Sequence, residues 1–121
     1  MEEHTEKLPG EAYSKNIRAR FWITGNHSGY IGIGRIELLE NIEQYGSISQ
    51  AAKNMGMSYK KAWKLIEELN HMYDEPLIVK VKGGKAGGGS ELTTKGKQLI
   101  KDFKRIETKL SQFLQELSNG L

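Results

Sequence analysis

Residues 58–64, SYKKAWK, combine a serine, a tyrosine and three lysines without an acidic residue. Lysine can donate hydrogen bonds to guanine acceptors or neutralise phosphates, and a serine at a helix start can hold a phosphate oxygen. A tyrosine beside them can pack on thymine methyl groups or on sugar. The segment therefore suits contact with DNA, and the predicted contacts are Ser58, Tyr59, Lys60, Lys61 and Lys64. The alternative is a solvated basic face, which is common on small helical domains.

Two further groups of polar residues could support such contacts. Ser47, Ser49 and Gln50 stand at an earlier helix start, where hydrogen bonds that position phosphates are expected. Lys82 precedes, and Lys85 lies within, a stretch with five glycines among the seven residues 83–89. Because glycine lets the main chain approach a ligand closely, we expect this loop to meet a phosphate or the minor groove. The alternative is a loop without a role.

Two short helices joined by a tight turn would position these side chains. Ser47 and Gln50 match a capping box, so a first helix is predicted to begin there. Gly56 can take the left-handed conformation that ends it. Ser58 is the cap of a second helix, predicted over 58–73, with a buried stripe of Ala62, Ile66, Leu69 and Tyr73. This pattern is typical of a helix-turn-helix, with 58–73 as the recognition helix.

The flanking segments predict a small scaffold around this motif. Alternation of apolar and polar residues over 18–24, with a return at 30–33, predicts a hairpin. A supporting helix follows at 34–45, with buried positions at Ile36, Leu38, Leu39, Ile42 and Tyr45. After the recognition helix, residues 77–82 predict a strand in which Leu77, Val79 and Val81 face the core. A short strand at 91–92 would complete a wing.

The last helix carries apolar residues at spacings of 4, 3, 4, 3 and 4. Thr93 is placed to cap it. The spacing is that of a heptad seam longer than a small core can cover, so we expect a symmetric homodimer. The predicted dimerisation residues are Leu99, Phe103, Ile106, Leu110, Phe113 and Leu117.

The chain of 121 residues is thus predicted to be mainly α with a small antiparallel β component. We expect a flexible N-terminal arm at 1–17, a winged helix-turn-helix at 18–93 and a dimerisation helix at 94–121. The net charge of +3 is too small to identify a nucleic-acid binder by itself.

Other functions lack a supporting pattern. The stretch GGKAGGGS has no Gly-Lys-Ser/Thr, so it fails as a phosphate-binding loop, and no catalytic set follows from spacing. We therefore expect no enzymatic activity and no cofactor. With no cysteine and three scattered histidines, no metal site is expected. No apolar run approaches the roughly 18 residues that span a bilayer, and the acidic N-terminus argues against export. A cytoplasmic location is expected.

The segments GSISQAAKNMGMSYKKAWKLIEELN and VKGGKAGGGSELTTKG resemble the N-terminal DNA-binding domain of the ModE-type, molybdate-responsive bacterial regulators. A more distant similarity, in Glu-Pro-Leu at 75–77 and Leu-Thr-Thr-Lys-Gly at 92–96, is to the LysR-type winged helix. The resemblance implies a winged helix-turn-helix that dimerises through helices outside the reading motif. Family members also carry C-terminal oxyanion-binding domains. Since this chain ends at Leu121, the resemblance implies a stand-alone form, and no molybdate site is expected.

The resulting interpretation is a homodimeric, sequence-specific regulator that binds double-stranded DNA in a prokaryote. Its recognition helix would enter the major groove, and its wing at 82–90 would lie on the backbone or in the minor groove. The alternative is a winged-helix interaction module that docks an acidic protein partner. Glycine-rich backbone suits phosphate better than a flat protein surface, which favours DNA.

Overall fold

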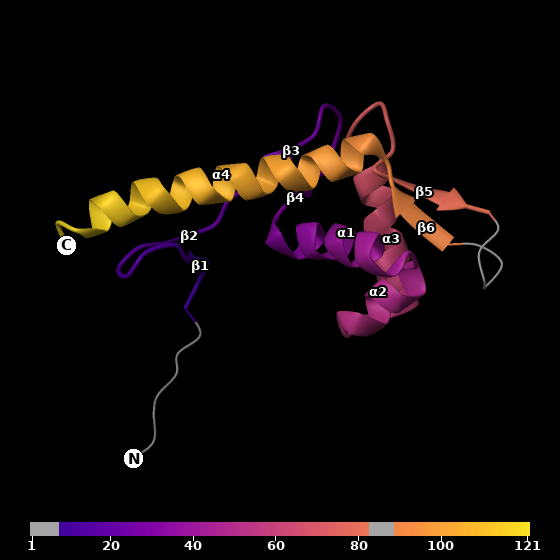
Figure 1. Cartoon of the computed structure of the whole chain (residues 1–121), viewed down its shortest axis with the longest axis horizontal. Helices are drawn as coiled ribbons and strands as arrows, with labels where there is room; N and C mark the ends of the chain where they lie inside the picture. Colours follow the sequence, from indigo (N-terminus) through magenta and orange to yellow (C-terminus); the bar gives the residue numbers. More distant parts are fainter. Residues whose placement is uncertain (1–7, 83–88) are drawn as a thin grey trace, which may run out of the picture. The chain divides into compact units, whose positions relative to one another are not determined.

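The computed structural model describes residues 8–82 and 89–121, which divide into two units. The larger is Trp22–Lys104, and the smaller joins residues 8–21 to residues 105–121. Four helices and three antiparallel two-stranded sheets make up the described chain (Figure 1). This agrees with the predicted fold class, a mainly helical winged helix-turn-helix followed by a long C-terminal helix. None of the described helices is long and apolar enough to cross a membrane.

Three helices form the centre of the larger unit: α1 (Ile33–Tyr45), α2 (Ile48–Asn54) and α3 (Tyr59–Asn70). Helix α1 packs against α2, and α2 packs against α3. Their buried side chains are aliphatic, and they are Ile36, Leu38, Leu39, Ile42, Ile48, Ala51, Ala52, Ala62, Ile66 and Leu69. Tyr45, predicted to be buried, is instead 44% exposed at the end of α1.

The predicted caps set the bounds of α2 and α3. The Ser47 hydroxyl accepts a hydrogen bond from the backbone N–H of Gln50 at 3.2 Å, and that of Ser58 accepts one from Lys61 at 3.1 Å. Each bond satisfies a donor that has no partner inside the helix. Between the two helices Gly56 has a φ of 66°, the left-handed value that glycine adopts without strain. The helix-turn-helix is therefore formed by local sequence signals.

Helix α3 ends three residues before the predicted position. It stops at Asn70, whose side-chain oxygen accepts from the backbone N–H groups of Leu77 at 2.9 Å and Ile78 at 3.0 Å. Tyr73 consequently lies outside the helix and is only half-buried, while Met72 is fully buried. The predicted stripe was right for its first three members and wrong for Tyr73.

The predicted wing is formed by β5 (Ile78–Val81) and β6 (Gly89–Leu92), which pair antiparallel from Ile78 opposite Leu92 to Val81 opposite Gly89. The predicted inward face was right for Leu77 and wrong in phase beyond it, because Ile78 is buried and Val79 is 36% exposed. Leu77 is also buried, but it precedes the strand, so two consecutive side chains point to the core.

The first hairpin of the larger unit is shorter than predicted. Strands β3 (Ile23–Thr24) and β4 (Tyr30–Ile31) pair antiparallel, which confirms a hairpin around the glycine-rich turn. Its turn packs on the chain beyond α3, where a Cβ added to Gly25 would lie 2.3 Å from the carbonyl oxygen of Met72. Only glycine permits this approach.

The smaller unit contains a second hairpin, which the sequence did not predict. Strand β2 (Arg18–Ala19) pairs with β1 (Glu11–Ala12), so Arg18 does not extend the strand that contains Ile23. The segment expected to be a flexible arm, residues 1–17, therefore contains a strand at residues 11–12, and residues 1–7 lie outside the described chain. The hydroxyl of Ser111 donates to the Tyr13 carbonyl at 2.9 Å, which ties the hairpin to the C-terminal helix.

That helix, α4 (Thr94–Ser118), begins with the predicted cap, because the Thr93 hydroxyl accepts from the N–H of Gly96 at 3.0 Å. The predicted heptad residues divide into two sets. Leu99 and Phe103 are buried in their own chain and Leu110 is half-buried. The outer set remains exposed, and it consists of Ile106 at 36%, Phe113 at 57% and Leu117 at 51%.

Candidate nucleic-acid interface

The outward face of α3 is a continuous polar stripe. It runs along Lys60, Lys64 and Glu67 and continues to His71 just past the helix end, at spacings of 4, 3 and 4. All four are exposed, since the opposite face is occupied by the buried side chains of the core. Amphipathic spacing thus leaves the basic start of α3 accessible from outside.

A hollow of about 520 Å³ collects most of the predicted recognition residues. It is lined by Ser58, Lys60, Lys61, Trp63, Lys64 and Glu67. Tyr59, the remaining predicted contact on α3, is 51% exposed at the first position of the helix. Because Ser58 caps the helix, the hollow lies beside a helix N-terminus, whose dipole favours a negatively charged ligand.

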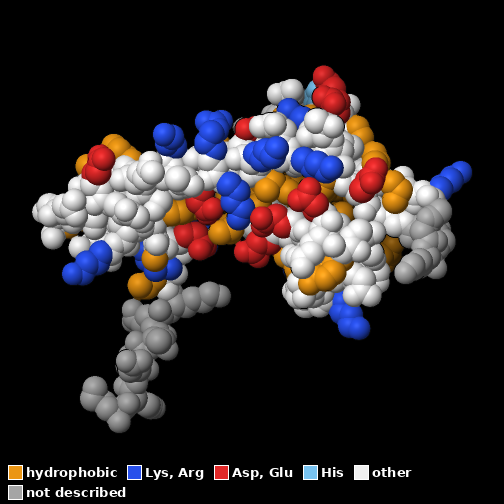
Figure 2. Space-filling model, viewed as in Figure 1, with side chains coloured by type: hydrophobic (Ala, Val, Ile, Leu, Met, Phe, Trp, Pro, Cys, Tyr) orange, Lys and Arg blue, Asp and Glu red, His pale blue; other side chains and the backbone are white. Residues whose placement is uncertain are grey.

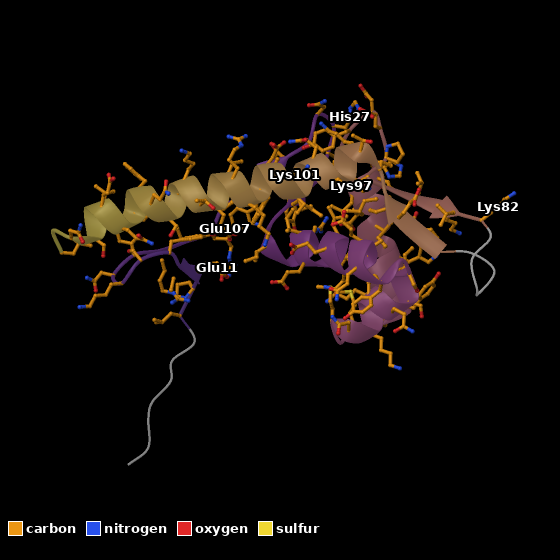
Figure 3. All side chains as sticks on the ribbon, viewed as in Figure 1. Glu11, His27, Lys82, Lys97, Lys101 and Glu107 are labelled. Carbon is orange, nitrogen blue, oxygen red and sulfur yellow. The ribbon has the colours of Figure 1, made fainter. Side chains whose placement is uncertain are left out.

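The predicted contacts on α2 and on the wing do not line this hollow. Ser49 and Gln50 are exposed at the start of α2, and Ser47 is half-buried because it serves as the cap. Lys82 follows β5 directly, and its side chain points away from the protein (Figure 3). Lys85 lies outside the described residues. The described contacts therefore form three separate groups, at the starts of α2 and α3 and beyond β5.

Trp63 connects the recognition helix to the wing. In the structure the Lys80 ammonium lies 5.0 Å from the centre of the indole ring. Lys80 belongs to β5, so a side chain of the wing covers the Trp63 ring of α3. This cation–π contact ties β5 to α3.

A second hollow of about 570 Å³ lies on the other side of the ridge formed by Lys64 and Glu67, which line both hollows. Arg35 stands in it, with its guanidinium 2.8 Å from the carboxylate of Glu68 and 4.6 Å from the centre of the Tyr30 ring. Sequence reasoning did not single out Arg35. The residue lies far from Glu68 in the chain, and no local pattern signals such a pair.

Positive charge is not confined to the helix-turn-helix. In the face drawn in Figure 2, Lys and Arg side chains also follow α4. Lys97 and Lys101 are exposed there, one turn apart (Figure 3). Positive charge alone would therefore not identify α3 as the candidate DNA-contacting helix. The helix-turn-helix geometry is what identifies it.

Two capped helices joined by a glycine turn, followed by an antiparallel hairpin, define a winged helix-turn-helix protein. A profile of the family described as "Bacterial regulatory helix-turn-helix protein, lysR family" matches residues 33–97, more than half of the chain. The chain belongs to this family, and its N-terminal region is of the ModE type indicated by the sequence motifs.

Several curated relatives are similar to more than half of this chain. The "Molybdenum transport protein ModE" of Azotobacter vinelandii is 44% identical over 87 residues, which are 72% of this chain and 32% of that protein. The "Transcriptional regulator ModE" of Haemophilus influenzae is 40% identical over 77% of this chain and 36% of its own length. The "DNA-binding transcriptional dual regulator ModE" of Escherichia coli strain K12 is 50% identical over 54% of this chain and 25% of its own.

The chain spans only about a quarter to a third of the length of these relatives. The family match runs from α1 to the start of α4, so it includes the sequence of the helix-turn-helix and of the wing. The comparisons support a DNA-binding transcriptional regulator, and none of the three relatives is named as an enzyme.

Proposed function

We propose that this chain is a sequence-specific, DNA-binding transcriptional regulator that acts as a homodimer in the cytoplasm. The observation that carries the proposal is the accessible basic start of α3, where Ser58, Lys60, Lys61 and Lys64 line one hollow at a helix N-terminus. Donors in this arrangement suit the acceptor-rich edges of guanine and the phosphates that flank the major groove.

The docking that follows places α3 in the major groove. Tyr59 and the lysines would contact base edges, while Ser47, Ser49 and Gln50 at the start of α2 would position phosphates. The wing, through Lys82 and Lys85, would lie on the backbone or in the minor groove. Lys80 would keep the wing in place through Trp63, since its ammonium already covers that ring.

The homodimer is supported by the apolar side chains that α4 leaves exposed. Ile106, Phe113 and Leu117 follow one another at spacings of 7 and 4 on the same face of the helix. A second copy of the chain would cover them symmetrically. Two recognition helices would then read half-sites about 34 to 36 Å apart, or a multiple of that distance.

The proposed target genes are inferred from the name of one relative. One relative is named for molybdenum transport, so we propose target genes concerned with molybdenum.

Two lysine pairs of equal spacing provide a matched test. In fluorescence anisotropy with fragments selected from genomic DNA, the double change Lys60→Ala and Lys64→Ala should weaken binding at least about tenfold, because donors to bases and phosphates are removed. The control is Lys97→Ala with Lys101→Ala, which removes the same charge at the same spacing from α4.

The control variant should keep nearly full affinity, and both variants should keep the melting temperature of the wild type. Equal losses in the two variants would indicate a purely electrostatic attraction and would contradict recognition through α3. Failure of the wild type to bind any genomic fragment at low salt would instead favour the module that docks an acidic protein partner.

A further inference from the structure

Glu67 adds a negative charge to the polar stripe of α3, after the two lysines. It lies three residues beyond Lys64 on the same exposed face, and both side chains line the two hollows beside the helix. Among the described residues, none forms an ion pair with its carboxylate. Its charge is therefore presented to whatever meets this face of the helix.

The adjacent Glu68 provides a contrast within the same turn. Its carboxylate lies 2.8 Å from the guanidinium of Arg35, and its side chain is half-buried between α3 and the start of α1. Packing and pairing within the fold explain an acidic residue at position 68. They do not explain one at position 67, which makes no comparable contact.

An exposed carboxylate on a surface that meets DNA costs affinity for every sequence, because phosphates repel it. A specific gain can offset this cost. In the major groove the amino group of cytosine donates a hydrogen bond that a carboxylate accepts, and cytosine has no acceptor beside it there. Guanine offers only acceptors at its groove edge, and the amino group of adenine stands beside the N7 acceptor, which repels a carboxylate. The charge of Glu67 thus disfavours most sequences and favours those with cytosine at one position.

We infer that Glu67 is a specificity-determining residue that accepts a hydrogen bond from a cytosine amino group in each half-site. The inference rests on the proposed function and names the base that one side chain reads. Three residues advance the helix by about 4.5 Å, and successive base pairs rise by about 3.4 Å. The cytosine should therefore lie one or two base pairs away from the base pair that Lys64 contacts.

The test is selection of bound sequences from a randomised double-stranded DNA pool by the full chain, with wild type and Glu67→Gln compared. The wild type should prefer cytosine about tenfold at one position of each half-site. Glutamine pairs with adenine, so the variant should lose this preference and shift toward adenine at that position alone. The control is Glu43→Gln, an equal charge change at an exposed position of α1.

Glu43→Gln should select the wild-type sequence unchanged. The inference is overturned if Glu67→Gln also selects the wild-type sequence, with or without a uniform gain in affinity. In that case the carboxylate acts only as a charge, and the proposed function survives. If the wild type enriches no sequence at all, the proposed function fails and the inference fails with it. Circular-dichroism melting checks that each variant is folded.

Discussion

Single residues couple α3 to the first strand of the wing. Trp63 belongs to the recognition helix and Lys80 to the first wing strand, and the cation over the ring at 5.0 Å is a direct link between them. An exposed contact of this kind is worth about 0.5 to 1 kcal/mol. This energy is small, but the contact joins β5 of the wing directly to α3.

Changing Lys80 to Ala should lower the free energy of unfolding by about 0.5 to 1 kcal/mol and alter the fluorescence of Trp63. Urea unfolding and emission spectra measure both effects, in a Trp22→Phe background so that Trp63 is the remaining indole. The control is Lys82→Ala, two positions along the chain, where the side chain points away from the protein. It should leave stability and emission unchanged and weaken only DNA binding, and identical behaviour of the two variants would exclude the coupling.

At this scale the sequence predicted the local contacts and missed the distant ones. The caps at Ser47, Ser58 and Thr93 depend on neighbours three residues away, so their spacing could be read directly. The contacts of Trp63 with Lys80 and of Arg35 with Glu68 join separate elements. Such pairs depend on how the elements pack against one another, and the hydrophobic periodicity of the sequence does not predict that packing.

Elements were predicted well where one face is buried and poorly where the chain changes direction. Helix α1 and the first three stripe residues of α3 follow helical spacing, since a single core lies beneath them. The end of α3 and the phase of β5 were wrong because the Asn70 side chain binds the backbone of residues 77 and 78. A side-chain amide that organises the following turn has no signature in hydrophobic pattern.

The N-terminal hairpin is the element that the sequence missed, and one of its contacts is sensitive to pH. The Tyr13 hydroxyl donates to the Glu107 carboxylate at 3.0 Å. Burial, this hydrogen bond and the charges of Glu107 and Glu11, which are labelled in Figure 3, raise the pKa of Tyr13 from 10.0 to about 12. The folded state therefore keeps this proton to higher pH than the unfolded chain does.

Stability from this contact should be complete below pH 10 and decline between pH 10 and about 12, where the folded state binds more protons than the unfolded one. The measurement is an ultraviolet titration of tyrosine in wild type and in Tyr13→Phe. Their difference should show one tyrosine that ionises near pH 12. A difference spectrum with a midpoint near 10 would mean that the hydroxyl is not held by Glu107.

For the whole molecule, the division of the predicted heptad seam decides which residues are free to join two chains. Leu99 and Phe103 are buried within their own chain, so the proposed dimer would rest on the other residues of the seam. The exposed side chains Ile106, Phe113 and Leu117 remain for that role, with Phe113 the largest and the most exposed at 57%. A heptad pattern could not distinguish the two sets, because both follow the same spacing.

Phe113→Glu should therefore convert the proposed dimer to a monomer at micromolar concentration, since a buried unpaired charge would face its symmetry mate. Light scattering measures the mass, and the control is Gln112→Glu, which places the same charge at the adjacent exposed position. The control should remain dimeric. A wild-type chain that scatters as a monomer would contradict the dimer at once.

The Phe113→Glu variant should also change the salt dependence of DNA affinity without changing the half-site sequence that each chain prefers. A dimer that neutralises six or more phosphates should lose about 10³-fold or more in affinity between 50 and 200 mM salt, because each neutralised phosphate releases counterions. The monomeric Phe113→Glu variant meets one half-site, so its salt dependence should have about half the slope, while its preferred half-site sequence stays the same. An unchanged slope would mean that one chain makes all the phosphate contacts, and the exposed face of α4 would then have no part in reading DNA.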